Sequence, residues 1–450
     1  MLRLRLCMAV LLQQFHRNNS DPNLHTLYMA RMLTFRAAAA LLLAALPALA
    51  WAQATPTPNR VDGYGTPNTT APSPPNPSNH GETELNILTS YYQQNGNNSA
   101  VEGGIGTQQL TDLTPTIILN VPLDSVTRVS ANLGMDYYSS ASTDRIDQVQ
   151  SSPSASDTRF HADFGYSRAL ADKRTVVGLG AGVSKEYDYF SVNFMGSWAH
   201  ASADGNRELS VAGQVFLDRA TIILPEELRA NGRRENGSDT RQSYNLNVVY
   251  SQVLSQRLQL AVSTELVAQR GLLSTPFQRV YFRETGSGYG AAKSELLPRQ
   301  RYKYPVGLRL TYYATDLLQV RGYYRFYNDN FGIQAHTFEL ETPLKVTPFF
   351  VLYPFYRYHT QTAADYFAPY LQHSITNQYY TSDYDLADFS ANKFGLGLRY
   401  SPVYGIGRFK TPFGGRVAKF KALDLRYAYY RQNTGLTASV ISADLSFTLP

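Results

Sequence analysis

The feature that most constrains the fold of this chain is an alternation with a period of two residues. Within 301–312, every second position is apolar or aromatic, and the positions between them are charged, polar or small. We call each of these two sets of alternate positions a parity. The apolar positions are Tyr302, Tyr304, Val306, Leu308, Leu310 and Tyr312, and the opposite ones are Arg301, Lys303, Pro305, Gly307, Arg309 and Thr311. Side chains alternate between the two faces of a β-strand, so this pattern predicts a strand with one apolar and one polar face.

The same alternation recurs along most of the chain. The candidate strands span 84–94, 113–122, 126–138, 157–170, 173–187, 188–200, 206–219, 241–254, 256–269, 300–314, 317–329, 333–343, 347–360, 391–402, 419–431 and 436–449. A soluble sandwich also alternates, but it rarely needs so many strands of this length. The pattern predicts an all-β, transmembrane, antiparallel up-and-down β-barrel of about sixteen strands, whose apolar face contacts lipid.

The connections between the candidate strands alternate in length. Short turns are expected at 122–125, 171–173, 203–206, 254–255 and 314–316, and longer loops near 138–157, 220–240, 270–299 and 361–390. Outer-membrane barrels have short periplasmic turns and long external loops. Three connections break the pattern: the external turns at 186–188 and 330–333 are very short, and the connection at 403–418 is long. Fourteen or eighteen strands therefore remain alternatives.

The N-terminal region predicts export. A basic start at 32–36 precedes an apolar run at 37–50, and Ala50-Trp51-Ala52 has the small-x-small pattern of a cleavage site. These are the parts of a secretory signal peptide cleaved near Ala52, and the run is short for a membrane anchor. The expected division is 1–31, a non-native upstream extension; 32–52, the signal peptide; 53–82, a Pro-rich disordered periplasmic linker; and 83–450, the barrel.

Charge and cysteine content exclude several classes of protein. Five of the 41 basic residues and one of the 35 acidic residues lie in 1–52, so the formal charge of +6 falls to +2 for the exported part. This balance gives no indication of nucleic-acid binding. The single cysteine, Cys7, precedes the cleavage site, so disulfides and thiol catalysis are excluded from the exported part. No cofactor or metal motif is present.

If the apolar parity faces lipid, the other parity lines the barrel interior. The candidate pore-lining residues are Arg301, Lys303, Arg309, Arg321, Arg325, Arg357, Lys393, Arg399, Arg426, Asp163, Glu208, Asp218, Glu265 and Glu339. The acids concentrate in the earlier strands and the bases in the later ones, which would create a transverse field and favour anionic solutes. The alternative is a ladder of structural ion pairs between neighbouring strands.

The segment 356–388 is unusually rich in Tyr and Asp and is predicted to be largely an external loop. Such a loop could cap the pore or bind a ligand, and the candidate binding residues are His359, Asp365, Tyr366, Asp383 and Asp385. Asp383 and Asp385 offer hard oxygen ligands, but two carboxylates are too few to predict a calcium site. His359, Asp365 and Ser382 also raise the alternative of a hydrolase at the rim.

Several motifs resemble a known bacterial family. They are Tyr323–Ile333 with Ala335–Thr337, Val351–Tyr358, Ala364–Pro369 and Tyr380–Leu386. They resemble the family catalogued as domain of unknown function 3570, and the similarity extends from about residue 83 to the C-terminus. The resemblance implies an envelope protein with an outer-membrane barrel, and it implies no reaction, ligand or catalytic residue.

The predicted function is a pore or transporter for small, in particular anionic, solutes across the bacterial outer membrane. The alternatives are a closed barrel acting as an envelope scaffold or export component and, third, the rim hydrolase. The expected partners are the lipid bilayer, a periplasmic protein docked on 53–82, and the insertion machinery. The last of these would read the alternating C-terminal strand 441–449, although it ends in Thr-Leu-Pro450 rather than on an aromatic residue.

Overall fold

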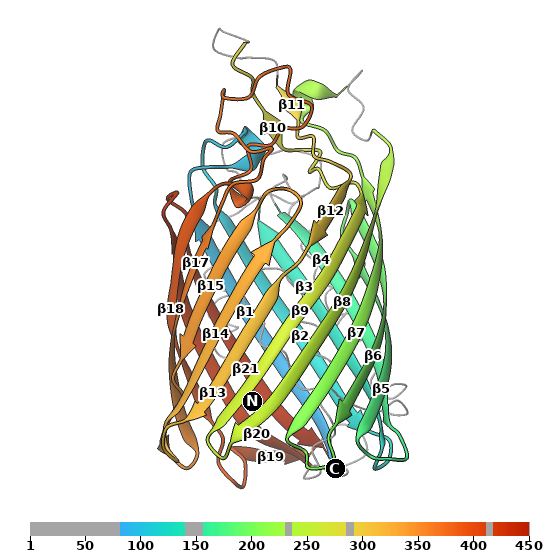
Figure 1. The fold of residues 1–450 in the computed structure, drawn as a ribbon, viewed down its shortest axis with the longest axis vertical. Helices are drawn as coiled ribbons and strands as arrows, with labels where there is room; N and C mark the ends of the chain where they lie inside the picture. Colours follow the sequence, from blue (N-terminus) through green and yellow to red (C-terminus); the bar gives the residue numbers. More distant parts are fainter. Residues whose placement is uncertain (1–81, 140–155, 230–235, 285–291, 411–416, 450) are drawn as a thin grey trace, which may run out of the picture. The chain divides into compact units, whose positions relative to one another are not determined.

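The crossing strands form one closed antiparallel barrel. The computed structural model describes residues 82–449 apart from 140–155, 230–235, 285–291 and 411–416. The expected upstream extension, signal peptide and linker therefore lie outside the described residues, Glu82 excepted. The barrel has sixteen strands, as predicted (Figure 1). The first strand, β1 (Thr83–Asn95), pairs along its whole length with the last, β21 (Thr437–Leu449), so no strand edge is left open.

Successive crossings pair with one another in chain order. Their bounds are β1 (Thr83–Asn95), β2 (Leu110–Pro122), β3 (Thr127–Ser139), β4 (Ser156–Ala169), β5 (Thr175–Lys185), β6 (Tyr189–Ala201), β7 (Arg207–Thr221), β8 (Ser238–Ser255), β9 (Leu258–Gly271), β12 (Gln300–Lys303) with β13 (Val306–Tyr313), β14 (Gln319–Asn328), β15 (Gln334–Glu341) with β16 (Leu344–Thr347), β17 (Phe350–Gln361), β18 (Phe389–Tyr400), β20 (Val417–Gln432) and β21 (Thr437–Leu449). The remaining short elements are β10 (Arg279–Val280), β11 (Lys293–Ser294), β19 (Gly407–Lys410), η1 (Ala100–Glu102), η2 (Glu226–Leu228) and η4 (Tyr384–Leu386).

Two crossings are each divided into two labelled strands at a proline. Both β12 and β13 pair with β9, and both β15 and β16 pair with β17. Pro305 and Pro343 lie at the two breaks. Proline has no backbone N–H to donate to the ladder, so the regular pairing lapses there while the strand continues.

The two rims of the barrel differ as the connection lengths predicted. We call the end that carries the long connections the loop rim and the opposite end the turn rim. Thr83 is in register with Leu449 at the turn rim, so both ends of the barrel sequence lie there. The connections at 186–188 and 329–333 are short, as predicted. The predicted strand boundaries needed correction mainly in three strands. Both β2 and β8 extend further toward the loop rim than predicted, and β5 ends at Lys185, before its predicted end.

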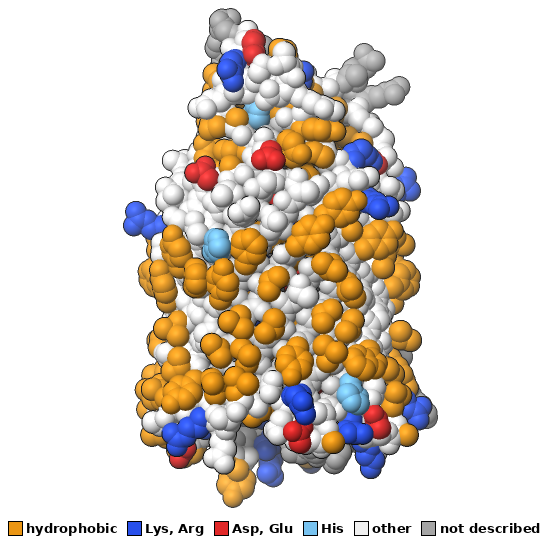
Figure 2. All heavy atoms as spheres, in the orientation of Figure 1, with side chains coloured by type: hydrophobic (Ala, Val, Ile, Leu, Met, Phe, Trp, Pro, Cys, Tyr) orange, Lys and Arg blue, Asp and Glu red, His pale blue; other side chains and the backbone are white. Residues whose placement is uncertain are grey.

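The outer face carries the apolar parity. Phe160, Phe164, Phe194 and Leu266 are exposed although they are large and apolar, and Leu179 is 69% exposed. Figure 2 shows apolar side chains across the middle of one face, with charged side chains gathered toward the ends. Exposed apolar surface of this extent belongs in lipid rather than in water. Among the described residues, no helix is long and apolar enough to span a bilayer.

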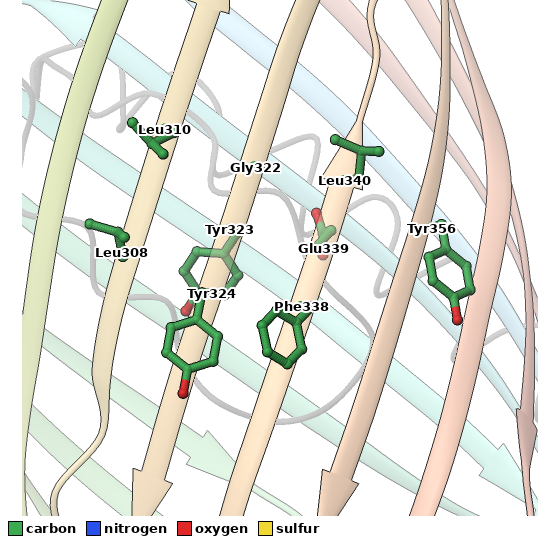
Figure 3. Close-up of a pocket in the computed structure, with 9 residues that line it drawn as sticks. All are labelled: Leu308, Leu310, Gly322, Tyr323, Tyr324, Phe338, Glu339, Leu340 and Tyr356. Atoms are coloured by element: carbon green, nitrogen blue, oxygen red, sulfur yellow. The ribbon is translucent and has the colours of Figure 1, made fainter.

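A shallow hollow on the outer face lies over Gly322, where no atom would contact an added Cβ. It has a volume of about 290 Å³ (Figure 3). Its lining includes Leu308, Leu310, Tyr324, Phe338, Leu340 and Tyr356. These side chains belong to the apolar parity, so the hollow is part of the lipid-facing surface.

Glycines on the inner face let side chains of the next strand lie flat against the wall. A Cβ at Gly397 would meet the ring of Tyr353, and a Cβ at Gly395 would meet the ring of Phe355. Tyr353 and Phe355 are buried, at 2% and 5% exposure. The inner wall is therefore closely packed where β17 meets β18.

We predict that Leu179→Arg destabilises the barrel in phospholipid vesicles. An arginine on the lipid face near the bilayer centre should lower the free energy of unfolding by about 2–4 kcal/mol. Urea unfolding in vesicles measures the change. Val403→Arg is the control, because Val403 is 77% exposed but lies in the connection after β18. Equal effects of the two substitutions would contradict the assignment of the outer face to lipid.

Candidate functional site

The inner face carries a ladder of ion pairs. The N–O distances are 2.5 Å for Arg301–Asp329, 2.8 Å for Arg321–Glu341, 2.9 Å for Arg241–Asp218, 3.2 Å for Arg357–Glu339, 3.5 Å for Arg325–Glu265, 3.8 Å for Arg399–Asp424 and 3.9 Å for Arg426–Glu341. Most of the predicted inner-face bases thus lie beside acids of the same wall. Pairing reduces the positive potential that an unpaired row of bases would create.

One of these contacts reaches across two intervening strands. Arg426 of β20 approaches Glu341 of β15, and its guanidinium lies 3.9 Å from the ring centroid of Phe355 on β17. The flat packing of Phe355 over Gly395 leaves room for the arginine above it. The contact therefore braces the inner wall and combines ion pairing with cation–π attraction.

Two predicted inner-face cations have no ion pair among the described residues. Arg309 lies over the ring of Tyr323, at 5.3 Å from its centroid. Lys303 is close enough to Arg301, Arg241 and Arg325 for their charges to repel its own, and the charge of Asp329 attracts it. Lys393 is in register with Arg357 and Tyr430 on the neighbouring strands.

Two predicted inner-face acids also have no ion pair in the described part of the chain. Asp163 of β4 accepts a hydrogen bond from Asn193 Nδ2 at 2.9 Å, and its carboxylate occupies the space over Gly182. Glu208 lies on β7. These two acids lie on β4 and β7, whereas Lys303 and Arg309 lie on β12 and β13.

The long loops interlock above the loop rim. We call the described residues 96–109, 222–229, 272–284, 292–299 and 362–388 the cap. Leu296 and Tyr380 exchange backbone hydrogen bonds of 3.1 and 2.8 Å, and Arg283 N donates to His373 O at 2.9 Å. These bonds join segments far apart in the sequence, so the cap is a folded unit.

Arg279 ties three parts of the cap together. Its guanidinium donates to both carboxylate oxygens of Glu227 at 2.5 and 3.0 Å, and to the carbonyl of Val101 at 2.8 Å. The residue is 7% exposed. A buried arginine with two-pronged bonding to a carboxylate holds both partners in a fixed geometry. This role of Arg279 could not be predicted from the sequence, because its partners lie in separate loops.

Two apolar clusters order the cap, and the first of them also includes residues of the turn between β14 and β15. One cluster contains Leu297, Phe331, Ile333 and Ala364, and Tyr366 packs edge-on against Phe331 with ring centroids 5.2 Å apart. A second contains Val280, Phe282 and Tyr380. Burial of these side chains supplies the free energy that orders long loops.

Buried acids lie beneath these clusters. Glu295 accepts hydrogen bonds from Thr381 Oγ1 at 2.5 Å and from Thr275 N at 2.6 Å. Burial, helped by the charge of Asp383, raises the pKa of Glu295 to about 8. Burial raises the pKa of Asp383, and the neighbouring Asp383 carboxyl raises that of Asp385. The Glu295 carboxyl therefore retains its proton near neutral pH.

The predicted loop residues are only partly brought together. Asp383 Oδ1 accepts from Asp385 N at 3.0 Å, and Oδ2 accepts from Gln278 Nε2 at 3.2 Å, so both oxygens hold local structure. Asp385 is exposed and lies near enough to Tyr430 on the inner wall to interact with it electrostatically. The cap therefore reaches the mouth of the barrel.

The assignment of His359 to the external loop is wrong. His359 lies within β17, where its ring bonds to Thr337 Oγ1 at 2.9 Å and to Gln361 Oε1 at 3.3 Å. Asp365 lies against Gly332, and Ser382 Oγ donates to the carbonyl of Ala368 at 2.9 Å. Among the described residues, His359, Asp365 and Ser382 are not bonded to one another.

A closed antiparallel barrel with an apolar outer face and a charged inner face defines a transmembrane β-barrel of the outer-membrane type. The chain belongs to the family described as "Protein of unknown function (DUF3570)", whose model matches residues 38–441. No curated protein matches the sequence.

Solved structures similar to this fold include outer-membrane proteins of several kinds. The siderophore receptor PirA from Acinetobacter baumannii is 13% identical, with a TM-score of 0.40 over 78% of this chain and 53% of that one. A bacterial polysaccharide outer membrane secretin is 12% identical, with a TM-score of 0.41 over 82% and 99%. OccK9 (OpdG) from Pseudomonas aeruginosa is 10% identical, with a TM-score of 0.36 over 82% and 98%. The chain spans about half the length of the PirA receptor.

We predict that the cap loosens as the pH rises. In the closed cap the pKa of Glu295 is about 8, whereas its usual value is 4.5. At pH values between these two, Glu295 is therefore protonated while it is buried and ionised once the cap opens. The free energy of opening the cap should therefore fall as the pH rises from about 4.5 to 8, and it should level off above 8. Hydrogen exchange of the amides in 362–388 measures this dependence.

Glu295→Gln should weaken the pH dependence, since glutamine keeps acceptor capacity without the charge. Glu226→Gln is the control, because Glu226 is an exposed acid of the same cap. Unchanged exchange profiles in Glu295→Gln would contradict the role of this carboxyl.

Proposed function

We propose that this protein is an outer-membrane pore for small polar solutes, in which the cap gates the external mouth. The observation that carries the proposal is the charged inner face of a sixteen-strand barrel, on which Lys303 and Arg309 form no ion pair within 4.0 Å among the described residues. Barrels of this strand number characteristically enclose an aqueous channel. Anionic solutes would be favoured along the wall that carries these cations.

The ion-pair ladder limits how selective such a pore would be. Because most of the arginines lie beside acids, they stiffen the wall and contribute little net potential. Selectivity would then depend on the few cations that have no acid beside them. A modest preference for anions follows, rather than exclusion of cations.

The expected partners remain part of the proposal. The apolar outer face fits the lipid bilayer, and β21, which closes the barrel against β1, would present the C-terminal strand to the insertion machinery. The proposed docking of a periplasmic protein on 53–82 and the cleavage near Ala52 concern residues outside the described part, Glu82 excepted.

A closed barrel that serves as an envelope scaffold is the second candidate. The cap favours this second candidate, because the buried Arg279 and the two apolar clusters hold the segments of the cap in place. Planar-bilayer recording of the refolded protein separates the two candidates. Conductance steps support the pore, and a silent barrel under all voltages supports the scaffold.

We predict that Lys303→Gln lowers the ratio of anion to cation permeability by about twofold, because it removes a fixed interior charge. The reversal potential in a salt gradient across a planar bilayer measures this ratio. Lys185→Gln should leave it unchanged, because Lys185 is an exposed lysine on the outer face of β5, in register with the outward-facing Phe160 and Phe190. An identical reversal potential in Lys303→Gln and the wild type would show that Lys303 does not line the ion path.

We predict that Arg279→Ala increases the time the pore spends in high-conductance states. The substitution leaves Glu227 and the Val101 carbonyl without their shared donor, so the cap segments separate more easily. Single-channel recording measures open and closed times. Arg257→Ala at the turn rim is the control, and equal gating in both variants would argue against the cap as the gate.

A further inference from the structure

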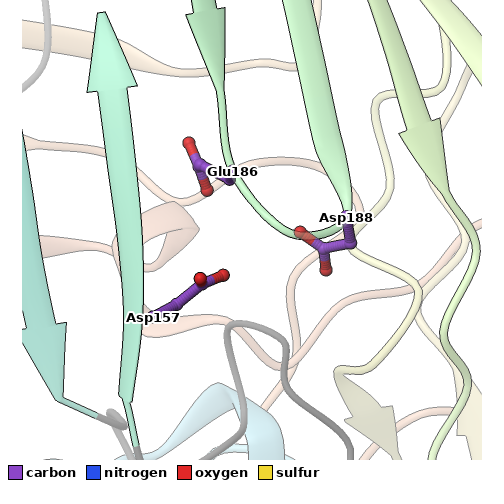
Figure 4. A group of neighbouring side chains, drawn as sticks. All are labelled: Asp157, Glu186 and Asp188. Carbon is purple, nitrogen blue, oxygen red and sulfur yellow. The ribbon is translucent and has the colours of Figure 1, made fainter. Parts of the chain in front are cut away.

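Three carboxylates converge at the loop rim, away from the cap acids. Asp157 is the second residue of β4, and Glu186 and Asp188 flank Tyr187 in the turn that joins β5 to β6. One oxygen from each acid lies within 4.8 Å of the other two. Figure 4 shows the three carboxyl groups turned toward a common space.

Asp157 supplies a buried oxygen without a partner. The residue is 2% exposed. Its Oδ1 accepts a hydrogen bond from Thr158 N at 2.7 Å, whereas Oδ2 is buried and has no hydrogen-bond partner in the described part of the chain. A buried carboxylate oxygen is rarely left unsatisfied, because removing it from water has a large unfavourable free energy. The residue is therefore built for a ligand that supplies positive charge.

Of the described side chains around the three acids, Arg159 is the cation that lies beside them, and it does not neutralise all three. Tyr138 donates its hydroxyl to Glu186 Oε2 at 2.9 Å, which orients that carboxylate. Arg159 Nε lies 3.8 Å from Glu186 Oε1, but it is also 3.7 Å from Asp136 Oδ2, so its charge is shared. Burial and the negative charges of Glu186 and Asp157 raise the pKa of Asp188 to about 6.

We propose that Asp157, Glu186 and Asp188 form a binding site for one Ca²⁺ ion. The donors are all hard oxygens, and Ca²⁺ binds such ligands at 2.3–2.6 Å in flexible geometries of six to eight ligands, with water in the remaining positions. Oxygens bound to one such ion are at most roughly 4.8 Å apart. The three oxygens here lie within that distance of one another. Mg²⁺ requires a smaller and more regular octahedron.

A bound ion would join the start of β4 to the short β5–β6 turn. Both are elements of the barrel wall, so the ion would stabilise the rim itself. This site could not be predicted from the sequence, since Asp157 is separated from the other two acids by the whole β4–β5 hairpin. Only the register of β4 with β5 brings them together.

The test is a titration of the folded, full-length protein in detergent after removal of metals with EDTA. Tb³⁺ is the probe, because Tyr138 and Tyr187 are close enough to sensitise its luminescence, and Ca²⁺ is then used to displace it. We expect one displaceable site with a Ca²⁺ dissociation constant of roughly 10⁻⁴–10⁻³ M, the range of sites that work outside the cell.

Asp157→Asn and Glu186→Gln should each weaken Ca²⁺ binding at least about tenfold. Asp239→Asn is the matched control, because Asp239 is an acid at the same rim that is already paired with Arg299 at 2.6 Å. Heat-modifiable migration in gels shows that each variant is folded, and the conservative Glu186→Gln remains informative if Asp157→Asn fails to fold. No saturable Ca²⁺ binding, equal binding by the folded variants, or tighter binding of Mg²⁺ than of Ca²⁺ would overturn the proposal.

Discussion

The structure depends on satisfying every backbone hydrogen-bonding group that faces lipid. In a bilayer, no water is available to an unpaired N–H or C=O group, so a sheet can cross only if it closes on itself. Here the closure is the pairing of β1 with β21, which runs in register from Thr83–Leu449 to Asn95–Thr437. The apolar outer face, the two unlike rims and the enclosed interior all follow from that closure.

Closure also sets the chemistry of the interior. Charged side chains on the polar parity cannot turn outward, so they pair with neighbours along the wall, as Arg357 does with Glu339. Glycines such as Gly397 let aromatic rings lie flat and keep the wall thin. The cap above this wall is built differently. It is irregular chain held by buried side chains, and Arg279 and Glu295 fix its segments through bonds that span separate loops.

The two-residue periodicity of the sequence was sufficient to predict the barrel, but it was not sufficient to predict the sites. Each strand that alternates between faces could be predicted locally, because one parity must meet lipid and the other must not. The partners of charged residues could be predicted only where they are in register on adjacent strands, as with Arg321 and Glu341. His359 was misplaced because a strand end and a loop start look alike in a tyrosine-rich sequence. The Glu295 carboxyl could not be predicted, since its burial arises from contacts with residues far along the chain.

The sequence by itself determined the class of fold, the strand number and which face of each strand is apolar, because these follow from a two-residue period and from the lengths of the connections. Tertiary structure alone decided which charges meet and how the loops fold over the barrel mouth. It also decided where acids converge, as Asp157, Glu186 and Asp188 do. The physical reason is that alternation is a property of neighbouring residues, whereas burial and charge pairing depend on strand register and loop packing between residues distant in the sequence.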